Sequence, residues 1–252
     1  MTASPQVTPP LRVTVWVEGR HERNDPEVAA LYPDGMGAPI AGAVEEHLGE
    51  TARTVTTTLD DPSQGLPDSL LDATDVLFWW GHQAHGEVED ALVSRVQDRV
   101  LAGMGLVVLH SGHHAKIFRR LMGTTCNLRW RNEADRELVW TVAPDHPLAH
   151  GVPSPIVLPE HEMYGEYFDI PAPDELVFVS SFSGGEVLRS GCTFTRGRGR
   201  IVYFSPGDQD YPVYHHDDVR RVLANAAAWA APRSRDFTLP PVERAETGWF
   251  TT

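Results

Sequence analysis

Cysteine is scarce in this chain, which has only two, Cys126 and Cys192, among its 252 residues. Two cysteines can form neither a disulfide framework nor a four-cysteine zinc site. The first ten residues, MTASPQVTPP, lack the charged start and the apolar run of an export signal. The scarcity of cysteine and the absence of such a signal predict a protein of the reducing cytoplasm.

Positive charge is also in short supply. The chain has 21 Lys and Arg against 35 Asp and Glu, which gives a formal net charge of −14. Nucleic-acid-binding proteins and proteins that dock on anionic membranes present basic surfaces, so this charge argues against both partners. No stretch approaches the roughly 18 consecutive apolar residues of a membrane-spanning helix. We therefore expect no nucleic-acid partner and no membrane partner.

The first half of the chain alternates β-rich or fully apolar runs with amphipathic runs. Strands are predicted over 13–17, 54–59, 75–80 and 105–109, and helices over 40–48, 87–101 and 115–122. This alternation is typical of βαβ units that build a parallel sheet. After residue 123 the rhythm changes to strands over 137–142, 176–180, 192–195 and 201–204, a loop-rich stretch over 144–173 and a last helix over 217–230.

These elements predict an α/β fold with a doubly wound, mostly parallel sheet and helices on both faces. We expect an insertion of loops and antiparallel strands in the second half. A single domain is expected over residues 11–231, a disordered tail over 1–10 and an extended C-terminal arm over 232–252. The sequence leaves open whether the arm packs on its own domain or on a partner subunit of a homo-oligomer.

Histidine is abundant, with twelve residues, and its placing is not random. Eight of the twelve closely follow predicted strands: His21, His82, His85, His110, His113, His114, His215 and His216. In an open α/β sheet the ligand binds outside the carboxyl ends of the strands. We therefore expect these side chains to gather at one edge of the sheet and to form a functional site there.

Two kinds of chemistry suit such a cluster. Neutral imidazole is the commonest ligand of transition metals, so His21, His82 and His85 are candidate ligands, with His110 as a further one. A carboxylate such as Glu18, Glu22 or Glu162 would complete the shell, and zinc is the metal we expect first. The alternative is that histidine serves as a general acid or base. Neither an HExxH nor a CxxC motif decides the matter, and a single histidine is more often a hydrogen-bonded structural residue.

Each of three other segments allows two interpretations. Trp79 and Trp80 are either core residues or the wall of a sugar-binding pocket. Arg129 and its neighbour Arg131 either hold substrate hydroxyls or pair with acidic residues of the same chain. The segment 159–167 is either a solvated acidic turn or a lid that supplies Glu162 or Glu166 as a ligand or base.

The segment HSGH after the apolar strand resembles the strand–turn–helix elbow that presents a nucleophile in α/β hydrolases and glutamine amidotransferases. Neither a GxSxG nor a GxCxG pattern is present, and neither cysteine falls at the elbow. Ser111 is therefore better explained as a cap of the following helix than as a nucleophile.

Several longer segments together resemble the trehalose-utilisation (ThuA-like) family, a branch of the glutamine-amidotransferase-like flavodoxin superfold. The resemblance covers about residues 12–232 and rests on the segments VWVE with HE, YPDGM, WWGH with His85, LHSGH, MGTTCNLRWR, EMYGE, GCTF and YPVYHH. It implies a flavodoxin-like core without the amidotransferase cysteine. It also implies a link to the catabolism of trehalose and related disaccharides through 3-keto intermediates.

One position departs from the family pattern. In close relatives a histidine follows the Pro-Gly pair, whereas Asp208 follows Gly207 here. If that histidine is a ligand in the relatives, Asp208 has to replace it through an oxygen atom, or the site loses one arm.

The sequence thus predicts an enzyme that acts on a keto-sugar or glycoside as an isomerase, lyase or hydrolase, by acid–base chemistry and with metal assistance. The expected cofactor is a divalent transition metal, with no nucleotide. Candidate catalytic residues are His110, Glu22 and Glu162, and candidate substrate-binding residues are Glu18, Trp80, His113, Arg129, Tyr164, Asp208, Tyr214 and His215. The alternative is a non-catalytic sugar-binding or regulatory module of the same fold.

Overall fold

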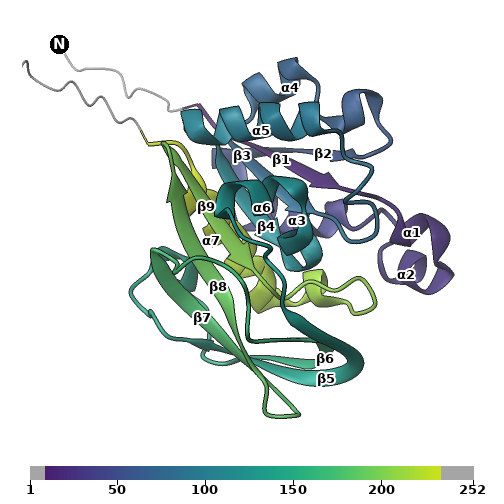
Figure 1. Ribbon diagram of the computed structural model, residues 1–252, viewed down its shortest axis with the longest axis vertical. Helices are drawn as coiled ribbons and strands as arrows, with labels where there is room; N and C mark the ends of the chain where they lie inside the picture. The colour runs from purple at the N-terminus through teal and green to yellow at the C-terminus, as the bar shows by residue number, and fades with distance from the viewer. Residues whose placement is uncertain (1–8, 234–252) are drawn as a thin grey trace, which may run out of the picture.

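A computed structural model describes residues 9–233 as one nine-stranded sheet flanked by helices (Figure 1). The tail expected over 1–10 and the arm expected over 232–252 lie, but for two residues each, outside the described residues. The strand order is β2-β1-β3-β4-β9-β8-β7-β5-β6. The strands are β1 (Leu11–Val17), β2 (Ala52–Thr58), β3 (Val76–Trp80), β4 (Gly105–Leu109), β5 (Arg129–Thr141), β6 (Ile156–Gly165), β7 (Glu175–Phe182), β8 (Val187–Arg196) and β9 (Gly199–Phe204).

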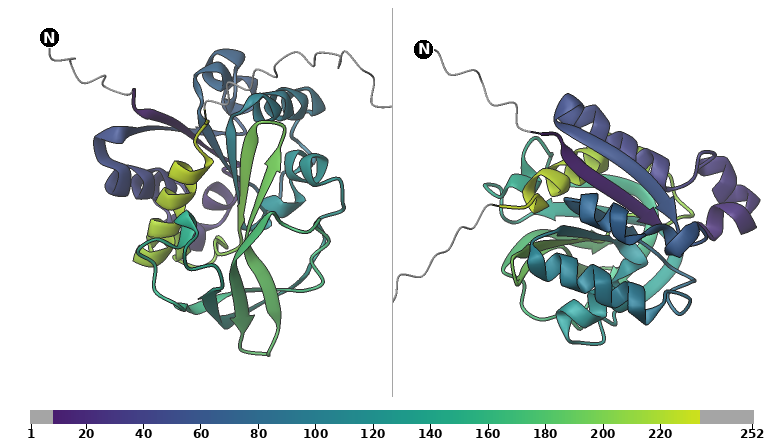
Figure 2. Two further views of the ribbon diagram at one scale, coloured as in Figure 1. Left: turned by 90° about the vertical axis from the view of Figure 1, so that its left-hand side faces the viewer. Right: turned by 90° about the horizontal axis from the view of Figure 1, so that it is seen from above.

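Helices cover both faces of the part of the sheet formed by β2, β1, β3, β4 and β9, as predicted (Figure 2). One face packs against α3 and α7, and the other against α4, α5 and α6. The helices are α1 (His21–Asn24), α2 (Pro26–Leu31), α3 (Gly37–Leu48), α4 (Asp68–Ala73), α5 (Asp90–Ala102), α6 (Lys116–Met122) and α7 (Asp217–Ala230). None of the helices in the described part of the chain is long and apolar enough to cross a membrane.

The central strands β3 and β4 are buried along their whole length, because helices cover them on both sides. Their side chains alternate between two apolar cores: Phe78 and Trp80 belong to the core under α3 and α7. Trp79, between them, belongs to the core under α5 and α6. This arrangement fixes the direction of the sheet, so the loops after β1, β3, β4 and β9 all leave from the same edge.

The sheet is mixed, and the expectation of a mostly parallel sheet is not confirmed. β2, β1, β3, β4 and β9 pair in parallel, whereas β9, β8, β7, β5 and β6 pair antiparallel. The antiparallel strands predicted after residue 123 do not form a separate insertion. They extend the same sheet outward from β9, because hairpins such as the one between β8 and β9 need no crossover helix.

The stretch 144–173 was expected to be loop-rich, but it contains β6, a ten-residue strand at the edge of the sheet. Pro159 lies within this strand, and proline is tolerated on an edge strand because its missing N–H costs no bond to a neighbour. The segment is therefore neither a solvated turn nor a lid. It is a strand that carries Glu162 to the site described next.

Candidate functional site

A cavity of about 450 Å³ opens at the edge of the sheet where β1, β3 and β4 end. Five histidines line it: His21, His82, His85, His113 and His114. His110 lies buried just beneath, so six of the eight histidines expected at this edge do gather there. The other two do not. His215 bonds to the carbonyl of Leu31 at 3.0 Å, and His216 accepts the N–H of Asp218 at the start of α7.

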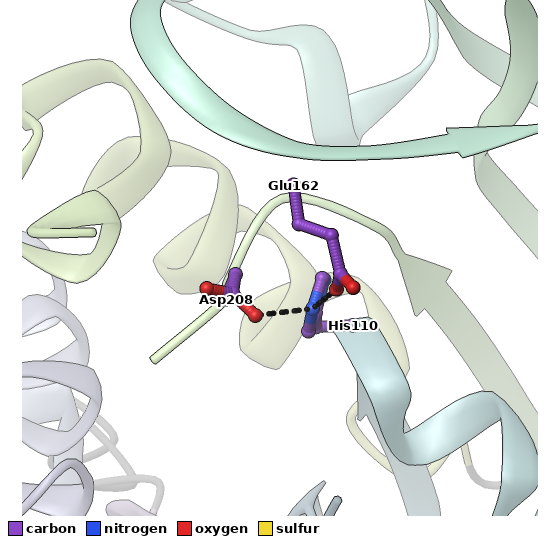
Figure 3. Close-up of side chains that lie close together, drawn as sticks. All are labelled: His110, Glu162 and Asp208. Carbon is purple, nitrogen blue, oxygen red and sulfur yellow. Dashed lines mark hydrogen bonds and ion pairs between the residues drawn. The ribbon is translucent and has the colours of Figure 1, made fainter. Parts of the chain in front are cut away.

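His110 is held between two carboxyl groups (Figure 3). Its Nε2 lies 2.9 Å from Glu162 Oε2 and 3.3 Å from Asp208 Oδ2, while its Nδ1 lies 2.8 Å from the carbonyl oxygen of Ser205. A carbonyl can only accept, so Nδ1 carries a proton. A lone pair on Nε2 would face two acceptor groups, so this nitrogen holds either a second proton or a cation.

The backbone at His110 explains how the ring reaches this position. The residue follows β4 with a φ of 47°, in the left-handed region that residues other than glycine and asparagine rarely adopt. Such strain persists only where surrounding contacts fix it, and it is common at functional sites. Here the turn directs the imidazole toward β6 and the loop after β9.

The charges of this group follow from its contacts. Burial opposes a charge on His110, but the hydrogen bonds and charges of Asp208 and Glu162 outweigh it and raise its pKa to about 10. Burial likewise disfavours the Asp208 carboxylate, but His110 lowers the pKa of Asp208 to about 2. When a proton occupies Nε2, His110 is therefore positively charged and Asp208 is negatively charged at neutral pH.

Tyr164 separates His110 from the cavity. The two rings are stacked, with centroids 4.5 Å apart and planes inclined by 7°, and His110 is fully buried. Glu162 and Tyr164, both on β6, line the cavity, whereas His110 does not. A ligand in the cavity therefore meets Glu162 directly, and His110 acts on it only through Glu162.

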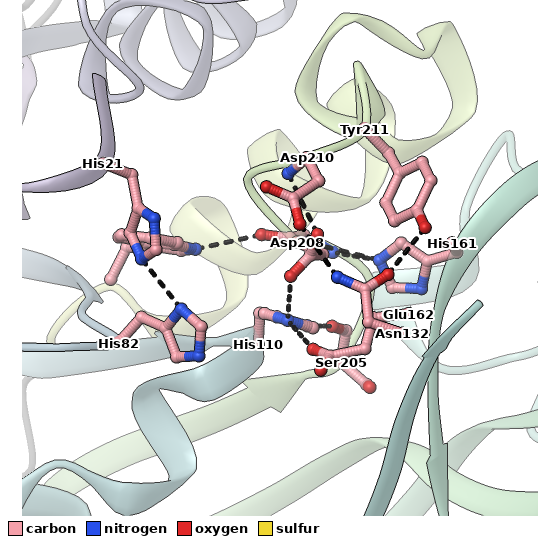
Figure 4. Close-up of polar contacts among 12 residues, drawn as sticks. His21, His82, His110, Asn132, His161, Glu162, Ser205, Asp208, Asp210 and Tyr211 are labelled. Carbon is pink, nitrogen blue, oxygen red and sulfur yellow. Dashed lines mark hydrogen bonds and ion pairs between the residues drawn. The ribbon is translucent and has the colours of Figure 1, made fainter. Parts of the chain in front are cut away.

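A second buried pair, Glu137 and His161, holds Asp208 in place, and Figure 4 shows His161 beside Asp208. Glu137 on β5 lies 2.7 Å from Nδ1 of His161 on β6, and it also accepts the Ser180 hydroxyl at 2.5 Å. Nε2 of His161 accepts the backbone N–H groups of Gly207 and Asp208 at 3.1 and 3.2 Å. The pair thus fixes the turn that directs Asp208 at His110.

This geometry bears on the position that departs from the family pattern. Asp208 does point into the site through oxygen, and it contacts His110. An imidazole, that of His161, lies against the backbone of the same turn, but it comes from β6 and not from the residue after Gly207. Asp208 therefore supplies an oxygen to the site, and His161 supplies the imidazole that lies against the turn of Gly207 and Asp208.

Three histidines of the cavity wall, His82, His85 and His113, form no contact with a carboxyl group, and burial keeps them neutral. His82 Nδ1 and His21 Nε2 share a hydrogen bond of 2.8 Å. Burial, then the charges of His110 and His21, lower the pKa of His82. Burial also lowers the pKa of His85 to about 4 and that of His113 well below its ordinary value. These rings can accept or donate a hydrogen bond at neutral pH.

Two predicted binding residues shape the site from beneath and do not line it. The Glu18 carboxylate accepts three backbone N–H groups of residues 82–84 at 2.6, 2.8 and 3.0 Å, which fixes the loop that presents His82. Trp80 donates its indole N–H to the carbonyl of Gly207 at 3.0 Å. Both side chains are buried, so their hydrogen bonds serve the fold.

Five further predicted residues are not brought to the cavity. Glu22 accepts the N–H of Met36 at 3.3 Å, and Arg129 is exposed to solvent on β5. Tyr214 is buried beside Tyr32, and His215 also stacks on that ring. Glu166, the other carboxylate proposed for a lid, pairs instead with a guanidinium, that of Arg189, at 2.8 Å.

Sequence reasoning missed several residues of the site. Trp130, Asn132, Gln209 and Asp210 line the cavity, and Glu137 and His161 lie below it. The Asn132 amide donates to Asp210 at 2.8 Å, which joins β5 to the loop after β9. A signal was available for Glu137, because it is a charged residue within a predicted strand and such residues need a buried partner.

The geometry singles out one candidate metal centre in the part of the chain that the structure describes. His110, Glu162 and Asp208 offer ligand atoms that all lie within 4.8 Å of one another. The predicted ligands His21, His82 and His85 do not form such a group. Metal binding itself stays a prediction.

Comparison with known proteins identifies the family of this chain. The family model described as ThuA, trehalose utilisation, matches residues 12–230. The chain belongs to the ThuA family. This membership indicates a role related to sugar metabolism. No curated protein matches the chain significantly.

Solved structures show the same fold at low identity. A ThuA-like protein from Parabacteroides merdae is 14% identical, with a TM-score of 0.61 over 92% of this chain and 93% of that one. A ThuA-like protein from Bacteroides uniformis is 17% identical, with a TM-score of 0.61 over 91% and 95%. PurLQS from Thermotoga maritima is 11% identical, with a TM-score of 0.51 over 87% and 99%.

Proposed function

We propose that this ThuA protein is an enzyme of sugar catabolism that acts on a keto-sugar or keto-glycoside, with Glu162 as its acid–base group. The observation that carries the proposal is the buried His110, held between Glu162 and Asp208 directly below a polar cavity. A carboxylate that lines a cavity and is backed by an ordered imidazole is the usual form of a proton-transfer site.

The proposed chemistry begins with a proton on the carbon next to the ketone, which is acidic because its conjugate base is an enolate. Glu162 takes that proton, and the C–H electron pair moves to form the enediolate. His82, which is neutral and lines the cavity, hydrogen-bonds to the oxygen where negative charge develops. His110 keeps the Glu162 oxygen in position throughout, and Asp208 keeps His110 in position.

Two reactions can follow from this enediolate. In isomerisation, protonated Glu162 returns the proton to the carbon that carried the ketone, while the hydroxyl proton of the first carbon moves to the former keto oxygen, so that the first carbon becomes the ketone. In elimination, the enolate re-forms the ketone, its former C=C electron pair becomes a new double bond to the carbon that carries the glycosidic oxygen, the bond from that carbon to the oxygen breaks, and Glu162 gives its proton to the departing oxygen. A 3-keto-disaccharide permits the second route because its glycosidic oxygen lies one carbon beyond the acidic C–H.

The same three residues fit a divalent transition metal, with zinc as the first choice. His110 offers a nitrogen, Glu162 and Asp208 offer oxygens, and Asp208 Oδ2 contacts the same imidazole nitrogen at 3.3 Å. When bound, the metal would polarise the keto oxygen as a Lewis acid. We expect protein purified without chelator to contain about one metal ion per chain by elemental analysis. Metal-stripped protein that turned over 3-keto-trehalose as fast as metal-loaded protein would rule out this role.

The proposal is tested by proton exchange, which does not depend on the final product. Wild-type protein incubated with 3-keto-trehalose in D₂O should introduce deuterium next to the ketone, as followed by NMR. Glu162→Gln should slow the exchange by roughly 10²- to 10⁴-fold. Glu160→Gln is the matched control, since Glu160 lies on the same strand and is exposed.

The two outcomes separate the competing functions. Exchange by wild type and by the Glu160 variant, but not by the Glu162 variant, supports the enzyme. Sugar binding by wild type with no exchange and no product would support the non-catalytic sugar-binding module instead.

A further inference from the structure

Trp130 is the most unusual side chain of the cavity, because it is 68% exposed and yet lines the cavity wall. Exposed tryptophan is uncommon, since its large apolar surface gains most from burial. Tryptophan also offers a flat apolar face with little conformational entropy to lose. An exposed tryptophan beside a polar cavity therefore suggests a ligand with a flat apolar face of its own.

The register of the sheet fixes where this ring lies. Trp130 on β5 is paired with Tyr164 on β6, and paired residues of antiparallel strands point to the same face of the sheet. Tyr164 on β6 stacks on His110, so Trp130 on the neighbouring strand β5 lies one strand further away from the buried imidazole. Asn132, two residues along, also lines the cavity.

The residue between them confirms the direction. Arg131 does not line the cavity, because it pairs with Asp135 at 2.8 Å and Glu186 at 2.7 Å. The alternation along β5 therefore presents Trp130 and Asn132 toward the cavity and Arg131 away from it. Asn132 is itself held by Asp210 and Tyr211, so this side of the opening is well ordered.

The cavity thus has two chemically different zones. The inner zone contains Glu162, His82 and His21, which suit hydroxyl and keto groups. The outer zone contains the exposed indole of Trp130. The volume of about 450 Å³ is within the range of roughly 300–1,000 Å³ that small-molecule sites have. A pyranose ring carries C–H groups on one face and hydroxyls around its rim, which matches the outer zone.

We propose that Trp130 forms a subsite for the second ring of a disaccharide, which stacks on the indole while the reacting ring lies at Glu162. The placing of the reacting ring rests on the proposed function. The substrate class is then a disaccharide or an aryl- or alkyl-extended glycoside, and a free monosaccharide fills only the inner zone.

The experiment measures binding without turnover. Trehalose and glucose lack the ketone that the proposed chemistry requires, so their affinities can be measured by calorimetry on active protein. The variants are Trp130→Ala, Trp130→Phe and, as the matched control, Trp140→Ala. Trp140 lies on the same strand, is also exposed, and does not line the cavity.

We expect wild type to bind trehalose more tightly than glucose. Trp130→Ala should weaken trehalose binding on the order of ten-fold and leave glucose unchanged, because only the outer contact is lost. Trp130→Phe should keep most of the trehalose affinity, and Trp140→Ala should keep all of it.

Three results would overturn the subsite. They are equal loss of both sugars in Trp130→Ala, no preference of wild type for the disaccharide, and dissociation of an oligomer by Trp130→Ala, measured by sedimentation, with sugar binding unchanged. The last result would assign Trp130 to contact with a second copy of the chain. None of these results depends on deuterium exchange, so failure of the subsite and failure of the proposed function can be told apart.

Discussion

Two kinds of histidine lie within one site, and their surroundings give them opposite properties. His82, His85 and His113 line the cavity, and burial lowers the pKa of each. His110 is more deeply buried than any of them, and yet its pKa is raised. The difference lies in Asp208 and Glu162, which flank only His110. Burial alone makes an imidazole neutral, whereas burial against two carboxyl groups makes it a cation.

After Glu162→Gln itself, the largest effect should come from removing Asp208, the carboxyl partner of His110 that does not line the cavity. Asp208→Asn leaves the shape of the turn intact but takes away the charge, so His110 should come to resemble the cavity-wall histidines. Because His110 then orients Glu162 less well, we expect kcat on 3-keto-trehalose to fall roughly 10- to 100-fold with KM little changed. Asp34→Asn, at an exposed position that does not line the cavity, is the control. Equal kinetics for the Asp208 variant and wild type would contradict the role given to this pair.

A smaller effect is expected one step further from the cavity. Glu137→Gln removes the charge that orders His161, and His161 in turn holds the Asp208 turn. We expect a loss of about 1–3 kcal/mol in the free energy of unfolding, measured by denaturant titration, because the buried contact of the carboxylate with His161 and its hydrogen bond from Ser180 are weakened. The kcat should fall while KM stays close to its wild-type value. A variant with lower stability but an unchanged kcat and pH profile would show that the pair is structural only.

The smallest effect concerns the way in which the free energy of unfolding depends on pH. The pKa of His85 is lowered on folding to about 4, so the unfolded chain binds a proton first as pH falls below about 6.5. Stability is therefore lost as pH falls from 6.5 toward 4, by about 1.4 kcal/mol per pH unit at most. His85→Gln should flatten this acid slope, and His150→Gln, at an exposed position, should not.

His110 has the opposite sign. Its pKa is raised on folding, so its contribution is fully present below about pH 6.5 and is lost as pH rises through about 10. NMR titration of the imidazoles checks both limbs. A His85 resonance that titrates near pH 6.5 would contradict the effect of burial described for the cavity wall.

The sequence predicted the five parallel strands and four of the helices that cover them, α3, α5, α6 and α7, but not α4. The fully apolar run 105–109 coincides with β4, and the predicted final helix coincides with α7. Because ligands bind where parallel strands end, the positions of His21, His82 and His110 also led to the right edge of the sheet. His215 failed this reasoning because ten residues separate it from the end of β9, and Tyr32 holds it elsewhere.

The antiparallel half was harder to predict. A Pro and two Glu obscured the alternation of β6, so Glu162 was expected on a turn or lid. His161 and Glu137 are distant in sequence and meet only through the pairing of β5 with β6. No local pattern encodes such a contact, which explains why the positioning pair was missed while Glu162 itself was found.

The chain of contacts from Ser180 through Glu137, His161 and Asp208 to His110 has a consequence for modularity. It begins on β7, crosses β5 and β6, and ends at the turn after β4. The helix-covered half of the sheet contains the histidines but not the carboxyl group that faces the cavity. We therefore expect no fragment ending before β5 to be active, even if it folds. An inserted residue in β7 would change the chemistry of a cavity that this strand never touches.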